Sequence, residues 1–244
     1  ITTEGAHSAT LATDRGEGAI TVEAAKLTTS GAGSPVIYST GNITANNVNG
    51  VANNSEIGVV EGKNSITLTN SNVTGYKDNG FMLYQSFSGD AESGIARLKA
   101  ENNTLTTHST GAFIYVNNTT AEVDLSNNAI SMPNTTTLVK ASADSRWGKD
   151  GENGGHLTLR ASNQELSGNI VADSISTIAI DMANGSSLVG AINTDNTAKE
   201  VTLKLSKDST WTLTGDSYVK TLTNEDTTGE NIHLNGYKLV VADK

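Results

Sequence analysis

Residues suited to ligand recognition gather in two segments of the chain, 85–94 and 141–155. Each segment combines an aromatic ring with several charged side chains. A flat ring flanked by carboxylates and a guanidinium fits the apolar face and the hydroxyl rim of a sugar. We therefore predict a binding site for a glycan, with neither catalytic residues nor a metal site. Its predicted residues are Phe87, Asp90, Glu92, Asp144, Arg146, Trp147, Asp150 and Glu152.

The second segment has other interpretations. Trp147 can fold back to cover the end of a sheet, with the charges around it solvating a long loop. The carboxylates of Asp144, Asp150 and Glu152 could hold Ca²⁺, which binds six to eight oxygens, although their spacing does not match an EF-hand loop. The predicted glycan site requires no cofactor.

The remaining candidates favour structural roles. The four histidines are scattered along the chain without the spacing of metal ligands. Tyr38, Tyr84 and Tyr115 close apolar runs at what we take to be one shared register. They predict either a stripe on which sugars stack or a cap beneath a loop.

The composition predicts a β protein rich in turns. Thr, Asn, Ser and Gly together make up 107 of the 244 residues, whereas charged residues make up 17%. These four residue types are poor in helix interiors, and Asn, Ser and Gly favour turns. Apolar clusters recur along the whole chain, which argues against disorder. Because Cys is absent, a disulfide framework and a thiolate zinc site are excluded.

The charge balance limits the class of partner. A net charge of −10 argues against nucleic acid and against an anionic membrane, since both are bound through basic surfaces. The longest apolar runs, such as 112–116, are far shorter than the ~20 residues needed to cross a bilayer. The chain starts at Ile1 without a Met or a signal peptide, so we expect it to be part of a longer protein.

An internal repeat organises the chain. The strings 20–22, 43–45 and 66–68 share an apolar-Thr-apolar pattern at intervals of 23 residues. A second apolar run begins 15 or 16 residues after each of the first five starts. Several short strands in a period of this length predict a parallel β-solenoid of about nine turns. The turns begin near Ile20, Ile43, Ile66, Leu98, Val123, Leu159, Ile180, Leu203 and Ile232.

This register makes two further predictions. The outward position between the first two apolar residues reads Thr21, Thr44, Thr67, Lys99, Asp124, Arg160, Asp181, Lys204 and His233. Three threonines followed by alternating charges suit neighbouring parallel strands, because opposite charges stabilise cross-strand pairs. An inward amide ladder is predicted at Asn47, Asn70, Asn102, Asn127, Asn163 and Asn184.

We predict a single domain over residues 1–244, in which residues 1–19 form an irregular start or cap. The two segments described first are longer than the equivalent connections in other turns, so they become inserts at 85–94 and 141–155. Both inserts leave the same edge of the solenoid. Because they lie two turns apart, their bases are expected to be separated by roughly 10 Å.

The repeat and two further segments resemble those of a known group of proteins. Residues 209–222, with a Trp-Thr-Leu-Thr-Gly-Asp-Ser core, look like the terminal turns of autotransporter passengers, and residues 164–176 look like repeats of large secreted bacterial proteins. The chain thus resembles the right-handed parallel β-helices of pectate-lyase-like topology found in bacterial surface adhesins. The resemblance implies a secreted or surface-displayed protein and carries no catalytic residue.

These observations lead to one expected function and two alternatives. We expect a non-enzymatic adhesin-like module that binds a polysaccharide, host matrix or cell-surface glycan through its inserts. A polysaccharide lyase or hydrolase of acidic sugars is the first alternative, with Arg146 or Lys149 as the base by analogy of fold alone. A passive stalk is the second.

Overall fold

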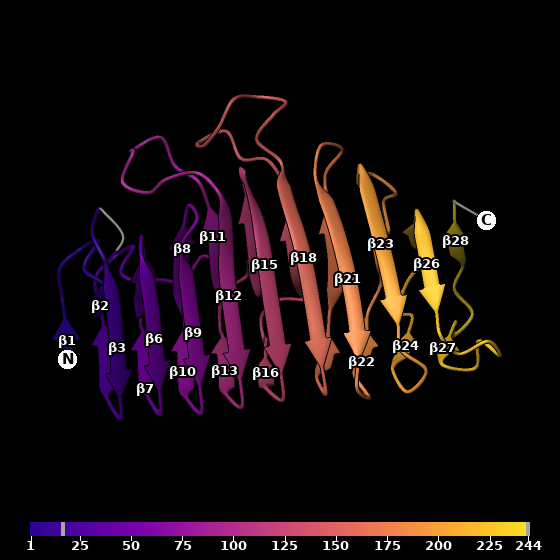
Figure 1. Cartoon of the computed structure of the whole chain (residues 1–244), viewed down its shortest axis with the longest axis horizontal. Coiled ribbons are helices and arrows are strands. Elements are labelled where there is room, and N and C mark those ends of the chain that lie inside the picture. Colours follow the sequence, from indigo (N-terminus) through magenta and orange to yellow (C-terminus); the bar gives the residue numbers. More distant parts are fainter. Residues whose placement is uncertain (16–17, 243–244) are drawn as a thin grey trace.

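The computed structural model describes residues 1–15 and 18–242. Over these residues the chain winds into an all-β parallel solenoid of about ten turns, close to the nine predicted, and contains no helix (Figure 1). Successive turns stack side by side along the rod, with the N-terminus at one end and the C-terminus at the other. No described segment forms a helix that could span a membrane.

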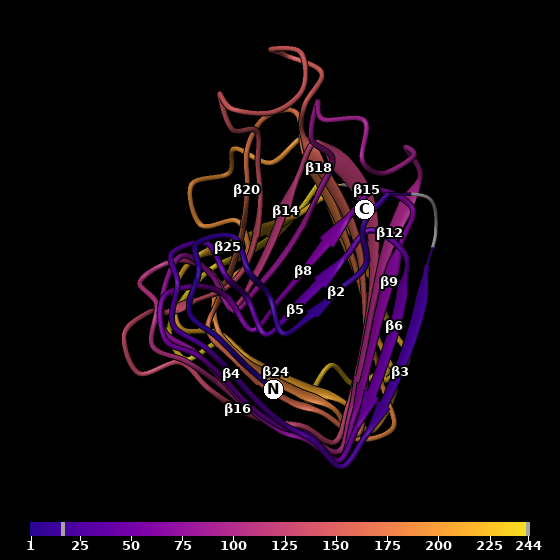
Figure 2. The same cartoon turned by 90° about the vertical axis from the view of Figure 1, so that its left-hand side faces the viewer.

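Each complete turn contributes strands to three faces, seen end-on in Figure 2. The first face is one continuous sheet. Its strands are β3 (Ala19–Glu23), β6 (Asn42–Asn46), β9 (Ser65–Thr69), β12 (Ile95–Glu101), β15 (Thr119–Ser126), β18 (Gly155–Ser162), β21 (Thr177–Ala183), β23 (Glu200–Leu205) and β26 (Thr221–Asn224).

The second face consists of two separate sheets. The first contains β1 (Thr2–Thr3), β4 (Lys26–Thr29), β7 (Asn49–Ala52), β10 (Asn72–Gly75), β13 (Thr104–Thr107) and β16 (Ala129–Ser131). The second contains β19 (Glu165–Ser167), β22 (Ser187–Val189), β24 (Thr210–Thr212) and β27 (Ile232–His233). Within the described residues no strand pairing joins β16 to β19, so the ladder of this face is interrupted in the middle of the rod.

The third face is also divided. Its main sheet contains β2 (Leu11–Ala12), β5 (Ile37–Ser39), β8 (Gly58–Glu61), β11 (Phe81–Tyr84), β14 (Ile114–Asn117), β17 (Thr137–Ala141) and β20 (Asn169–Ala172). A two-stranded sheet, β25 (Ser217–Val219) and β28 (Leu239–Val241), ends this face. Every described pairing between the named strands is parallel, as the repeat predicted, because each strand meets the equivalent strand one turn away.

The core follows from the alternation of side chains along the first face. Ile43, Leu68, Leu125, Leu159 and Leu203 are all buried, as the register predicted. Successive side chains of a strand point to opposite faces, so the residues between them point to solvent. The stacked interior is therefore lined by similar apolar side chains from neighbouring turns.

The predicted outward column is confirmed from Thr21 to Lys204. The strand registers place Thr67, Lys99, Asp124, Arg160, Asp181 and Lys204 side by side in that order. Arg160 forms an ion pair with Asp124, at 3.2 Å between Nη1 and Oδ1. The end of the column was predicted wrongly, because Thr223 rather than His233 follows Lys204.

The same error affects the start of the last turn. Ile232 and His233 lie on β27 of the second face, where they pair with Trp211 and Thr212. The first-face strand of that turn is instead β26, which contains few apolar residues. The terminal turn is less fully buried, so apolar residues do not mark its first-face strand. The apolar pattern therefore identified β27 instead of β26.

The predicted inward asparagines are also wrong, by one residue. Asn47, Asn70, Asn102, Asn127, Asn163 and Asn184 are exposed, and each has a positive φ of 48–58°. Asn is one of the few residues that tolerates this left-handed conformation, which turns the chain from the first face to the second. The residue type alone does not distinguish an asparagine with this backbone role from an asparagine whose side chain points inward.

From the third turn to the sixth, the inward ladder is formed by the residue that follows the asparagine, namely Ser71, Asn103, Asn128 and Gln164. Oδ1 of Asn103 accepts from the backbone N–H of Ser71 at 2.9 Å, and Oδ1 of Asn128 accepts from that of Asn103 at 3.1 Å. Oε1 of Gln164 accepts from the N–H of Asn128 at 2.8 Å. The side-chain amide of Gln164 also donates to the backbone carbonyl of Asn128 at 2.8 Å. It therefore bonds both the N–H and the carbonyl of Asn128, at the level where β16 and β19 do not pair.

Residues 1–19, where an irregular start was expected, contain two short strands and the first residue of β3 in the described part. β1 pairs with β4 and β2 pairs with β5, each in parallel. They continue the second and third faces beyond the first turn predicted from the repeat.

The polar ladder provides a test of the corrected register. Asn128→Ala should lower the free energy of unfolding by about 1–3 kcal/mol, because it leaves the buried N–H of Asn103 and the carbonyl of Ala100 without their partner. Asn127→Gly, one residue earlier, should change it by only a few tenths of a kcal/mol, since Gly adopts a positive φ readily. Urea unfolding of both variants checks this, and equal losses would contradict the assignment.

Candidate functional site

A groove of about 620 Å³ runs along the outer surface of the third face. In the end-on view this face lies between the corner loops that join it to the second face and the inserts that lead to the first (Figure 2). The groove is lined by His7, Ala9, Ala12, Gly33, Pro35, Tyr38, Glu56, Val59, Asp78, Asn79, Met82, Tyr84, Arg146 and Trp147. Its volume lies within the range of pockets that hold small ligands.

The floor of the groove is made by outward side chains of stacked strands. Tyr38, Val59 and Met82 lie at equivalent positions of β5, β8 and β11 and line the groove, and Tyr115 of β14 continues this row beyond the groove lining. Tyr84 lies two residues further along β11, next to Glu61, so the prediction that the three tyrosines share one register is wrong for Tyr84. These side chains form an apolar cluster outside the solenoid core.

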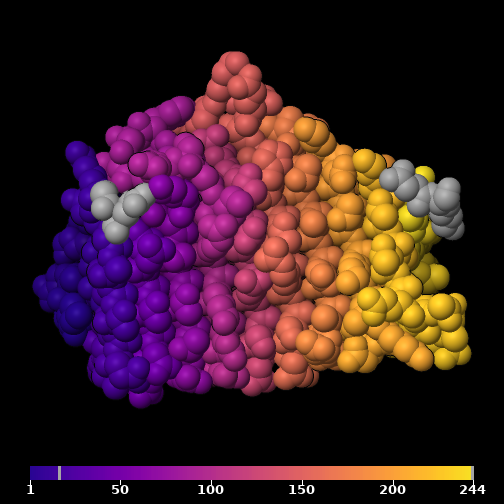
Figure 3. Space-filling view, in the orientation of Figure 1, coloured from indigo at the N-terminus to yellow at the C-terminus, as the bar shows by residue number. Residues whose placement is uncertain are grey.

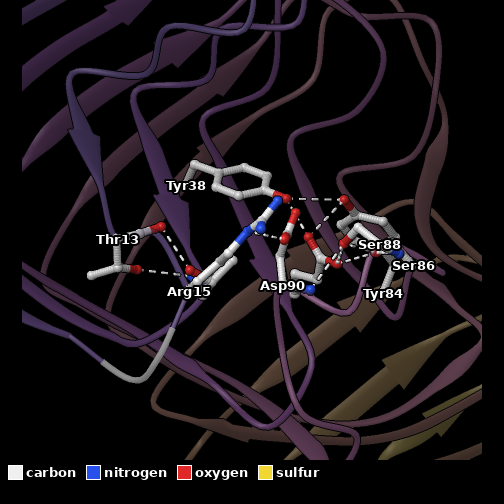
Figure 4. Close-up of polar contacts among 9 residues, drawn as sticks. Thr13, Arg15, Tyr38, Tyr84, Ser86, Ser88 and Asp90 are labelled. Carbon is white, nitrogen blue, oxygen red and sulfur yellow. Dashed lines mark hydrogen bonds and ion pairs between the residues drawn. The ribbon is translucent and has the colours of Figure 1, made fainter.

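Glu61 forms the centre of a buried network beside this floor. Its partners Tyr38, Tyr84, Ser86 and Ser88 are labelled in Figure 4. The Glu61 carboxylate is 1% exposed and accepts hydrogen bonds from the hydroxyls of Tyr38, Tyr84, Ser86 and Ser88. The Tyr84 and Ser88 bonds measure 3.1 and 3.2 Å. Burial raises the pKa of both tyrosines far above the usual range of a phenol, so the two hydroxyls remain donors.

This network fixes the first insert to the floor of the groove. Ser86 and Ser88 belong to the insert at 85–94, whereas Glu61 and the tyrosines lie on third-face strands. Asp90, in the same insert, forms an ion pair with Arg15 at 2.5 Å. Figure 4 shows the Arg15 side chain extending from beside Thr13 towards Asp90, below the Tyr38 ring. The insert is therefore held at several points rather than extended into solvent.

One wall of the groove is acidic. Glu56 and Asp78 lie in corner loops of adjacent turns, and Glu56 is only 6% exposed. The Ser55 hydroxyl donates to Glu56 Oε2 at 2.6 Å, and Asn79 is a second hydrogen-bonding partner. Burial raises the pKa of Glu56, and the charge of Asp78 raises it further, while the two hydrogen bonds lower it. The carboxyl group is thus held where its ionised form is costly.

The two predicted aromatic residues of the inserts lie together. The ring centroids of Phe87 and Trp147 are 6.3 Å apart, and those of Tyr84 and Trp147 are 5.5 Å apart. Trp147 is half-buried against the tyrosine floor and lines one end of the groove. It therefore covers the sheet and also presents surface to the groove. Phe87 is 69% exposed.

The predicted charged residues are mostly paired with each other or with the rod. Arg146 binds Asp144 through two nitrogens, at 3.0 and 2.9 Å, which lowers the pKa of Asp144. Glu92 pairs with Lys63 at 2.7 Å, and Glu152 with Lys149 at 2.5 Å. Of the predicted set, Arg146 and Trp147 line the groove, and Asp150 lies exposed in the second insert, which protrudes from the rod (Figure 3).

The charged residues also bear on the calcium hypothesis. Asp144 and Glu152 each have a basic partner, and the described residues contain no group of three or more acidic or His side chains arranged to hold a metal ion. Calcium binding at the second insert stays a prediction.

Sequence reasoning missed the acidic wall. Glu56 and Asp78 lie 22 positions apart in separate corner loops, and neither belongs to an insert. The sequence did contain a signal that the outer side of this face is special, because β8 and β11 carry the apolar residues Val59 and Met82 at outward positions. A strand that is apolar on both faces indicates that its outer face is covered or contacts a ligand.

The fold and the groove define a parallel β-solenoid with a concave, partly aromatic third face. Comparisons of this chain with family models, with curated proteins and with solved structures gave no match. The resemblance to adhesins of pectate-lyase-like topology thus gains no support from relatives, and the parallel β-solenoid is the part of it that is established.

Glu61 offers a test of how the first insert is held. Glu61→Ala should lower the free energy of unfolding by about 2–4 kcal/mol, because several buried hydroxyls lose their acceptor. Glu101→Ala serves as a control, since Glu101 lies on the first face and its side chain forms a surface ion pair with Lys99. Thermal unfolding and protease cleavage within 85–94 provide the readouts. Identical behaviour of the two variants would contradict the role of Glu61.

The raised pKa of Glu56 predicts a pH-dependent stability. Because the folded carboxyl ionises less readily than its unfolded counterpart, stability should fall as pH rises above the unfolded value of about 4.3. Glu56→Gln removes this penalty, so the variant should be more stable than the wild type at pH 7, with the difference shrinking toward pH 4. Urea unfolding at both pH values checks this. An equal difference at the two pH values would refute the assignment.

Proposed function

We propose that this chain is a non-enzymatic binding module that holds a glycan in the groove of its third face. The single observation that carries the proposal is the groove itself. It has tyrosine, tryptophan and methionine on its floor and end, with carboxyl, amide and guanidinium groups at its rim. Aromatic surface for a sugar ring and polar groups for its hydroxyls are the two requirements of such a site.

The wider role that we propose is adhesion. The resemblance of residues 164–176 and 209–222 to secreted bacterial proteins supports a surface-displayed or secreted module of a longer protein. In this role the ligand is a polysaccharide, host matrix or cell-surface glycan. The concave third face provides the contact surface, and the rest of the rod provides length.

The enzymatic alternative has less support. A lyase of acidic sugars needs a free base and a surface that attracts carboxylates. Arg146 is engaged by Asp144, Lys149 lies with Glu152 on the exposed insert, and the wall of the groove is itself acidic. A passive stalk would not need an apolar outer floor. We therefore favour binding over both alternatives.

The test is a glycan array followed by affinity measurements on Trp147→Ala. Loss of this ring should weaken binding of any captured glycan by about 2 kcal/mol or more, as expected for an aromatic anchor. Tyr76→Ala is the matched control, because Tyr76 is an exposed aromatic residue that stacks on His108 outside the groove lining. Binding unaffected by Trp147→Ala, or weakened equally by Tyr76→Ala, would contradict the proposed site. Turnover of a polysaccharide would favour the enzymatic alternative.

A further inference from the structure

The charged residues that line the groove indicate which class of glycan it binds. Among the described residues, neither Glu56 nor Asp78 has an ion-pair partner, although both line the groove. Arg146, which also lines the groove, is bound to Asp144 through two nitrogens. The charge of Asp78 contributes to the raised pKa of Arg146, but among the described residues no ion pair joins the acidic wall to a basic group.

A buried carboxyl group without a cation is an unusual feature of a surface groove. Glu56 is 6% exposed, and its polar partners are the neutral groups of Ser55 and Asn79. Burying an unpaired carboxylate is costly, and an ammonium group brought in by a ligand would offset that cost. A ligand carboxylate would instead meet like charges and be disfavoured.

The aromatic side chains of the groove suit the same ligand. Tyr38 and Trp147 are half-buried and line the groove together with Tyr84. Their rings can stack on the apolar face of a pyranose, and their π faces also attract a cation. The Glu61 carboxylate cannot serve as the ligand's partner, because four protein hydroxyls already surround it. Glu56 and Asp78 remain as the acidic recognition groups.

We infer that the groove selects amino sugars, with a free ammonium group bound by Glu56 and Asp78 while the sugar ring lies against the aromatic side chains. This inference rests on the proposed glycan-binding function and specifies its ligand class. It predicts a preference for oligomers of 2-amino-2-deoxy sugars over their N-acetylated and acidic counterparts.

Calorimetric titration with four probes tests this inference. The probes are the tetramers of glucosamine, N-acetylglucosamine and galacturonic acid, and tetralysine, at a pH where the amines are protonated. The wild type should bind the glucosamine tetramer at least about tenfold more tightly than each of the others, because a charge-assisted hydrogen bond contributes more than 1.4 kcal/mol. The double variant Glu56→Gln/Asp78→Asn should lose this preference but still bind the N-acetylated tetramer.

A matched control separates this site from general attraction of cations to an acidic protein. The double variant Asp181→Asn/Glu101→Gln removes the same number of carboxylates from the first face and should keep the preference. If it loses the preference equally, or if the groove variant keeps it, the inference is overturned. Equal binding of the three sugars by the wild type would overturn the inference alone, whereas binding of no sugar would overturn the proposed function as well. Tighter binding of tetralysine would point to a basic peptide and overturn the inference.

Discussion

The stacking of each turn on the next is the constraint on which the rest of this structure depends. Parallel strands of neighbouring turns lie about 4.8 Å apart, so any residue that points inward must fit the equivalent residue above and below it. Apolar residues satisfy this requirement along the first face, and Ser71, Asn103, Asn128 and Gln164 satisfy it with amide and hydroxyl groups at one corner. Thr, Asn, Ser and Gly are abundant because short polar side chains and tight corners suit such a stack.

Stacking also decides where a ligand can bind. Strands cannot shift without breaking their ladders, so variation is confined to outward side chains and to corners. The third face uses both, since its outward residues form an apolar floor while corner loops and the two inserts form the surrounding walls. The network around Glu61 joins these parts by bonding insert hydroxyls to strand residues. The first insert is therefore attached directly to the strands beneath the groove.

The sequence was sufficient to predict the solenoid, its approximate number of turns and the order of the column from Thr21 to Lys204, because a repeated pattern constrains many turns at once. The prediction of the inward asparagines failed, because the residue type does not show whether an asparagine adopts a positive φ at a corner or points its side chain inward. The predicted register also failed at β26, where apolar residues no longer mark the strand. The acidic wall was missed because Glu56 and Asp78 lie in corner loops of two adjacent turns. Only the stacking of those turns brings them to one groove, so no short sequence motif contains both.

The interruption between β16 and β19 has a mechanical consequence. A tensile force along the rod is shared by three ladders in most turns, but at this level only the first and third faces are paired. The reciprocal bonds between Asn128 and Gln164 are the nearby polar link across the gap. The third face has an interruption of its own beyond β20, where a single bridge between Ile170 and Ile192 continues it. Since each turn of a solenoid is coupled mainly to its neighbours, a rod pulled from both ends should yield at the levels where one of its three ladders is missing.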